Sequence, residues 1–192
     1  GSKRWVARKD KALKQTFDTA AELLQVQAKR SSRQGFSYEV PIKEYQEFCS
    51  KFPYQETFDQ KKTIDEVVVD MQKPVPMDRL ICGEVGFGKT EVIMRAAFIA
   101  AFNKKQTCVL VPTTLLASQH FSSFIDRFEN TGVEIGVLSR NIKSKQKDEL
   151  LLNLNEGKID ILIGTHAVLQ NNVKFHDLGL LVIDEEHRFG VR

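Results

Sequence analysis

The sequence has few cysteines and no long run of apolar residues. Its three cysteines, Cys49, Cys82 and Cys108, are far apart and form no C-x-x-C pair, so neither a disulfide framework nor a zinc site is indicated. The four histidines are also too scattered to match a metal-ligand spacing. No apolar run approaches the roughly 18 residues that a membrane-spanning helix needs, and the N-terminus lacks the apolar core of a signal peptide. We therefore expect a cytoplasmic protein with no membrane association.

Internal repeats and low-complexity tracts are also lacking. Apolar residues make up 42% of the chain and charged residues 28%, which is close to the average for soluble globular proteins. This composition excludes a largely disordered chain. A length of 192 residues is enough for one domain with a hydrophobic core and an appendage at one end.

Charge is unevenly distributed along the chain. The net charge is only +3, but residues 1–33 contain nine Lys and Arg against three acidic residues. Such a segment can meet phosphate or an acidic protein surface, and it can equally be a solvated helix face. Leu13, Phe17 and Leu24 lie on one stripe at helical spacing, which predicts a helix over residues 3–32. We assign residues 1–34 to a basic amphipathic linker helix.

Residues 35–76 read as a short helical segment. Pro41 can start a helix that runs to about residue 48, and Thr57 can cap another that runs to residue 71. The proline-containing stretch 72–76 then ends this segment.

From residue 77 to residue 192 short apolar runs alternate with amphipathic ones. The pattern predicts strands at residues 80–82, 108–111, 134–138, 159–163 and 178–183, with helices at 90–102, 114–129 and 144–155. This alternation is typical of an α/β fold with a mostly parallel sheet flanked by helices.

A phosphate-binding loop is predicted at residues 83–90, which match G-x-x-x-x-G-K-[ST]. Glycines let backbone N–H groups turn inward around an anion, and the N-terminus of the next helix adds its positive end. In this motif the lysine reaches the β- and γ-phosphates and the threonine hydroxyl binds Mg²⁺, so ATP and Mg²⁺ are the expected cofactors. The alternative is a glycine turn with an incidental lysine. The residues concerned are Gly83, Glu84, Val85, Gly86, Phe87, Gly88, Lys89 and Thr90.

A second acidic motif follows the apolar run 180–183. It consists of Asp184, Glu185, Glu186 and His187, and its carboxylates are expected at the C-terminal end of a strand, where open α/β sheets bind ligands. Asp184 is then placed to hold Mg²⁺, and Glu185 to orient and deprotonate an attacking water. The alternative is a solvated acidic turn.

Together these two motifs resemble those of the superfamily 2 helicases and translocases, which have RecA-like lobes. Two further loops fit the resemblance, and in this superfamily both touch the nucleic-acid backbone. Thr hydroxyls and N–H groups at a helix start suit phosphate contacts that read no bases. For Thr113 and Thr165 a simple helix cap is the alternative. The residues in these loops are Thr113, Thr114, Gln119, His120, Thr165 and His166.

Residues 52–60 resemble the Q motif of the same superfamily. There, the Gln60 amide is expected to pair with the edge of adenine and Phe52 to stack on its ring, because an amide both donates and accepts hydrogen bonds. Both side chains can equally be ordinary residues at a helix entry.

At a finer level residues 77–98, 157–166 and 177–192 resemble the bacterial transcription-repair coupling factors. RecG-like fork-remodelling helicases share the ending of this stretch but usually carry Ser where Phe87 stands. Glu84 departs mildly from an Asp that is common in the coupling factors. A module that only binds partners and keeps a vestigial nucleotide site is the third alternative.

The resemblance implies an ATP-dependent translocase on double-stranded DNA that displaces stalled RNA polymerase and couples transcription to nucleotide excision repair. Contacts with RNA polymerase and with the excision-repair protein UvrA are expected through domains outside this sequence. The sequence ends eight residues after Asp184, and a second lobe that supplies an arginine to ATP is not in it. We therefore expect the 192 residues alone to be nearly inactive as an ATP hydrolase.

Overall fold

A single parallel sheet organises the centre of the molecule. The computed structural model describes residues 2–83, 86–140 and 142–185, without the side chains of residues 2–13, 15 and 31. The sheet contains β1 (Gln106–Leu110), β2 (Ile135–Leu138), β3 (Ile161–Gly164) and β4 (Leu178–Ile183) in the order β2-β3-β1-β4, and every pairing is parallel. Strands β1 and β3 are buried along their whole length, as expected for the central strands of a parallel sheet.

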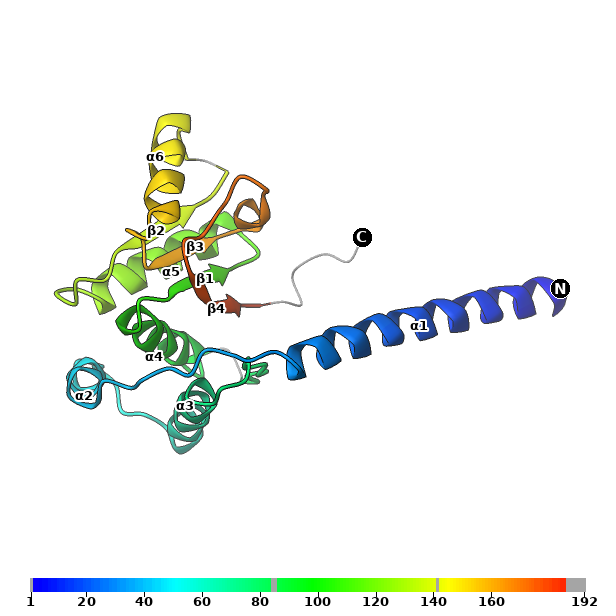
Figure 1. Cartoon of the computed structure of the whole chain (residues 1–192), viewed down its shortest axis with the longest axis horizontal. Helices are drawn as coiled ribbons and strands as arrows, with labels where there is room; N and C mark the ends of the chain where they lie inside the picture. Colours follow the sequence, from blue (N-terminus) through cyan, green and yellow to red (C-terminus); the bar gives the residue numbers. More distant parts are fainter. Residues whose placement is uncertain (1, 84–85, 141, 186–192) are drawn as a thin grey trace.

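Helices cover both faces of this sheet (Figure 1). On one face α4 (Lys89–Phe102) and α5 (Thr114–Arg127) pack against Val109, Ile161 and Ile163. On the other face α6 (Ser144–Asn155) and the short helix η1 (His166–Leu169) pack against Cys108 and Leu162. The predicted α/β fold with a parallel sheet between helices is therefore confirmed.

Two further helices lie on the outer side of α4. The ring of Phe48 in α2 (Ile42–Ser50) stacks on that of Phe98, with ring centroids 4.4 Å apart. Ile64 and Met71 of α3 (Phe58–Met71) are buried in a cluster with α4. As predicted, Thr57 caps α3, since its Oγ1 accepts a hydrogen bond from the Gln60 N–H at 3.2 Å. Because α4 is covered on both sides, its residues 91–101 are all buried.

The N-terminal helix α1 (Ser2–Ser31) projects away from the rest of the protein (Figure 1). An ion pair between Arg30 and Asp78 fixes its C-terminal end. Further along the helix Phe17 is 72% exposed and Leu24 is 70% exposed. The predicted helix is confirmed, but nothing in the described part of the chain covers Phe17 and Leu24 of its apolar stripe. None of the described helices is long and apolar enough to cross a membrane.

The strand predicted at residues 80–82 is wrong. These residues form no regular structure, and Leu80 is 74% exposed. The preceding Arg79 instead binds α3, with Nε 2.6 Å from Asp70 Oδ2 and a second ion pair of 2.6 Å to Glu66. These contacts hold the segment along α3, and an apolar run of three residues is too short to outweigh them. The other predicted strands and helices are confirmed, with ends shifted by at most two residues.

Candidate active site

The phosphate loop lies at the start of α4. Gly86 and Gly88 have φ values of +88° and +79°, in the left-handed region that glycine adopts readily. Lys89 reaches back across the loop, and its Nζ donates a hydrogen bond to the Gly83 carbonyl oxygen at 2.6 Å. Glu84 and Val85 lie outside the described residues. The amino end of α4 therefore faces the loop, as anion binding requires.

Asp184 lies beside this loop, directly after β4. Its N–H donates to the Leu110 carbonyl oxygen at 2.9 Å, which continues the pairing of β4 with β1. The pKa of Asp184 is lowered, chiefly because His120 donates a hydrogen bond to its carboxylate, and the positive charge of Lys89 lowers it further. Since the Lys89 charge contributes to the lowered pKa of Asp184, the phosphate loop and the acidic motif lie within electrostatic reach of each other.

Glu185, the predicted catalytic base, has a left-handed backbone with φ of +52°. A residue other than glycine in this region is strained by about 1–3 kcal/mol, and such strain concentrates at functional sites. Its N–H donates a hydrogen bond to the Asp184 carboxylate, which also helps to keep that carboxylate ionised. Glu186 and His187 lie outside the described residues.

The donors at this site fit Mg²⁺. The predicted ligands are the carboxylate of Asp184 and the half-buried hydroxyl of Thr90, both hard oxygen ligands. Within residues 2–83, 86–140 and 142–185, no group of three or more His, Cys, Asp or Glu residues is placed to hold a metal. Mg²⁺ is usually bound by one or two carboxylates together with the phosphates of a nucleotide.

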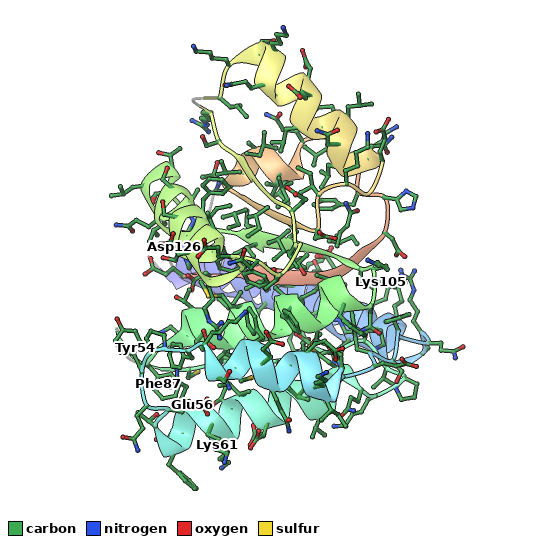
Figure 2. The ribbon with its side chains drawn as sticks, turned by 90° about the vertical axis from the view of Figure 1, so that its left-hand side faces the viewer. Tyr54, Glu56, Lys61, Phe87, Lys105 and Asp126 are labelled. Carbon is green, nitrogen blue, oxygen red and sulfur yellow. The ribbon has the colours of Figure 1, made fainter. Side chains whose placement is uncertain are left out.

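The Q-motif glutamine contacts the phosphate loop itself. Gln60 is 4% exposed, and its Nε2 donates to the Gly88 carbonyl oxygen at 3.3 Å. Half-buried Phe52 lies against Tyr54, with ring centroids 5.5 Å apart. In Figure 2 Tyr54 and Glu56 lie at the same end of the molecule as Phe87 of the loop, far from Lys105. The segment 52–60 thus borders the loop, while its contacts with adenine stay a prediction.

A buried network of charges behind the loop was not predicted from the sequence. The Glu91 carboxylate accepts hydrogen bonds from Arg95 Nε at 2.8 Å and from Arg127 Nη2 at 2.7 Å. Arg95 also donates from Nη2 to Glu56 at 2.5 Å. The network joins α4, α5 and the Q-motif segment around two negative and two positive charges. Only the spacing of four residues between Glu91 and Arg95 signalled it in the sequence.

The residues predicted to touch nucleic acid follow β1 and β3, at the edge of the sheet that also carries Asp184. Thr113 is exposed and caps α5, since its Oγ1 accepts from the Leu116 N–H at 3.2 Å. Thr114 is half-buried, and Gln119 and His166 are exposed. Thr165 is only 6% exposed and makes no side-chain cap for η1. For the exposed Thr113, Gln119 and His166, contact with nucleic acid stays a prediction.

His120 lies on the inner side of α5 instead. It is 7% exposed, and its Nε2 is 2.8 Å from Asp184 Oδ2. Its place between the buried Ala117 and Phe124 on one stripe of α5 was the sequence signal that it points inward. The stripe does not predict that His120 contacts Asp184.

Comparison with known proteins identifies the family. Residues 57–192 match the model of the DEAD/DEAH box helicases. The transcription-repair-coupling factor of Haemophilus influenzae is 55% identical over 191 residues, covering 100% of this chain and 17% of that protein. The Escherichia coli K12 protein of the same name is 54% identical over 192 residues and is also covered to 17%. The chain thus spans about one sixth of the length of these relatives.

A solved structure, that of RecG bound to a three-way DNA junction, aligns with a TM-score of 0.80 and 34% identity over 88% of this chain and 23% of that chain. The resemblance to the coupling factors and to RecG-like proteins is thereby confirmed. The phosphate loop and the acidic motif that converge at the sheet edge lie within the matched residues, and the chain belongs to the DEAD/DEAH box helicase family.

Proposed function

We propose that this chain is the ATP-binding lobe of a double-stranded DNA translocase that displaces stalled RNA polymerase and couples transcription to nucleotide excision repair. The nucleotide site is supported by the position of the loop at the amino end of α4 and of Asp184 after β4, within electrostatic reach of Lys89. The identity of 55% to a transcription-repair-coupling factor supports the more specific activity. Within the chain we propose a linker helix (residues 1–34), a Q-motif segment (35–76) and the RecA-like lobe (77–192).

The side chains divide the work of ATP hydrolysis. Lys89 moves from the Gly83 carbonyl oxygen to the β- and γ-phosphates, while loop N–H groups bind the remaining phosphate oxygens. Thr90 and Asp184 hold Mg²⁺, which when bound neutralises charge that develops on the phosphates. Glu185 orients the attacking water and takes its proton. Phe52 and Gln60 hold the adenine.

Double-stranded DNA is the proposed partner of the exposed loops after β1 and β3. We propose that the N–H groups at the start of α5 and the exposed side chains of Thr113, Gln119 and His166 bind backbone phosphates without reading bases. RNA polymerase and UvrA are proposed to bind other parts of the longer protein. A RecG-like fork-remodelling helicase is the second candidate, favoured by the structural alignment to RecG. The higher identity to the coupling factors favours the first.

Titration of a fluorescent ATP analogue in the presence of Mg²⁺ tests the nucleotide site. The wild-type chain is expected to bind it and the Lys89→Ala variant to lose most of that binding. Lys61→Ala removes an exposed lysine of α3 and is the matched control, which should bind like wild type. Equal binding by wild type and Lys89→Ala, or no binding by either, would leave only a partner-binding module with a vestigial site.

A further inference from the structure

We infer that His120 is a positioning residue for the Mg²⁺-binding carboxylate of Asp184, an inference that rests on the proposed nucleotide site. The two side chains come from different motifs and lie 64 residues apart in the sequence. His120 Nε2 and Asp184 Oδ2 are separated by 2.8 Å, the length of a strong hydrogen bond to a charged group.

The direction of this hydrogen bond follows from the charge of its acceptor. A carboxylate that binds Mg²⁺ is ionised, and an ionised carboxylate only accepts hydrogen bonds. His120 therefore donates from Nε2. The lone pairs of the carboxylate that neither His120 nor the Glu185 N–H uses are left for the cation or for a water bound to it. The hydrogen bond from His120 thus restricts the rotation of the Asp184 carboxylate.

The imidazole is itself held rigidly. His120 is 7% exposed, and its ring meets that of Phe124 edge to face, with centroids 6.2 Å apart. Phe124 is completely buried against the sheet. A donor fixed in this way reduces the orientations open to the Asp184 carboxylate.

Helix α5 connects this contact to the exposed loop that precedes it. Thr113, the N-terminal cap of α5, is seven residues before His120, or roughly 10 Å along a helix. Less than two helical turns therefore separate Thr113, a proposed contact to the nucleic-acid backbone, from His120, which orients Asp184. This position, and the burial of His120, favour a role inside the nucleotide site over contact with nucleic acid.

Binding of the fluorescent ATP analogue with Mg²⁺ and with EDTA tests the inference on the 192-residue chain. His120→Phe keeps an aromatic ring beside Phe124 but removes the donor, and His120→Gln keeps an N–H donor. Loss of a group that orients a metal ligand typically lowers metal affinity about 10- to 100-fold. In the presence of Mg²⁺ we expect His120→Phe to bind the ATP analogue about 10- to 100-fold more weakly than wild type. In EDTA the two proteins should bind it equally. His120→Gln should recover part of the affinity that is lost with Mg²⁺.

A double-mutant cycle that combines His120→Phe with Asp184→Asn keeps the test valid even where a substitution weakens the fold. If His120 acts through Asp184, adding His120→Phe to Asp184→Asn changes Mg²⁺-dependent binding no further. An additive effect, a wild-type Mg²⁺ response in His120→Phe, or equal losses with Mg²⁺ and with EDTA would overturn the inference alone. A wild-type chain that binds no nucleotide at all would overturn the proposed function and this inference with it.

Discussion

The side chain of Gln60 lies directly against Gly88 of the phosphate loop. Its Nε2 is 3.3 Å from the Gly88 carbonyl oxygen, and a Cβ placed on Gly88 would lie only 2.4 Å from that nitrogen. Because Gly88 has a φ of +79° and Gln60 is buried, the two residues fix each other's position. The Q-motif segment therefore shapes the phosphate loop through a direct contact.

This contact predicts that Gly88→Ala disables the nucleotide site. The added methyl group displaces the Gln60 amide and strains a left-handed backbone, so we expect loss of most binding of a fluorescent ATP analogue. Gly132→Ala is the matched control, since Gly132 has a φ of +75° but nothing lies within 4 Å of its Cβ position. Both variants should lose about 1 kcal/mol or more of stability from backbone strain.

Only Gly88→Ala should lose nucleotide binding, whereas Gly132→Ala should bind like wild type once both are shown to be folded by circular dichroism. Unchanged binding by Gly88→Ala would show that the loop adjusts around Gln60 and that this contact does not shape the site.

Most of the sheet and its helices could be predicted from hydrophobic periodicity, because buried strands and amphipathic helices leave that pattern in the sequence. The failure at residues 80–82 has a different origin. Three apolar residues suffice to suggest a strand, but the ion pairs of Arg79 with Asp70 and Glu66 are contacts between distant residues that no local pattern encodes.

The candidate site, too, could be predicted from the sequence only in part. The two motifs predict a common site for Lys89 and Asp184, but the strand expected before the phosphate loop does not form, so the shared edge of a parallel sheet accounts only for the position of Asp184. The inward position of His120 follows from the buried stripe of α5, yet its contact with Asp184 depends on how α5 crosses the sheet. The network of Glu56, Glu91, Arg95 and Arg127 depends likewise on how α4 packs against α5 and the Q-motif segment.

The buried charges predict a large effect of Arg127→Met on stability. Arg127 pairs with the 4% exposed Glu91, and its guanidinium lies 3.9 Å from the centre of the Phe48 ring. Removal of one partner from a buried ion pair costs about 3–5 kcal/mol, and the lower end applies here because Arg95 still binds Glu91. Urea denaturation measures this change in the free energy of unfolding.

Lys51→Met is the matched control for that measurement. Lys51 pairs with Glu47 at 3.6 Å on the surface, where an ion pair contributes about 1 kcal/mol or less. Similar losses in the two variants would mean that the network around Glu91 adds no more stability than a solvated pair.

The buried thiol of Cys108 predicts a specific loss of stability at high pH. Burial raises the pKa of Cys108 from 9.0 to about 12. As pH rises above 9, the unfolded chain releases this proton while the folded chain retains it, so folding becomes less favourable until the folded pKa is passed. The free energy of unfolding of the wild type should therefore fall more steeply than that of Cys108→Ala between about pH 8 and about pH 10.5.

Urea denaturation under reducing conditions at each pH checks this difference. Cys108→Ala should be less stable at neutral pH, because it loses buried contacts, and the gap to wild type should narrow as pH rises. Tyr38, whose pKa burial raises to about 12, contributes equally to both proteins and cancels. Parallel stability curves for the two proteins would show that the Cys108 thiol titrates alike in the folded and unfolded chains.

ATP hydrolysis by the 192-residue chain alone is predicted to be very slow, with or without double-stranded DNA. The resemblance to superfamily 2 motors implies that a second lobe supplies an arginine to the transition state, and loss of such an arginine typically lowers turnover by about 10³- to 10⁵-fold. Phosphate release measured at saturating ATP tests this, with Glu185→Gln to remove the proposed base and the exposed Glu149→Gln as control. Residual turnover that belongs to this site should disappear in Glu185→Gln and persist in Glu149→Gln. Rapid, DNA-stimulated turnover that only Glu185→Gln abolishes would contradict the prediction, because one lobe would then supply every group that hydrolysis needs.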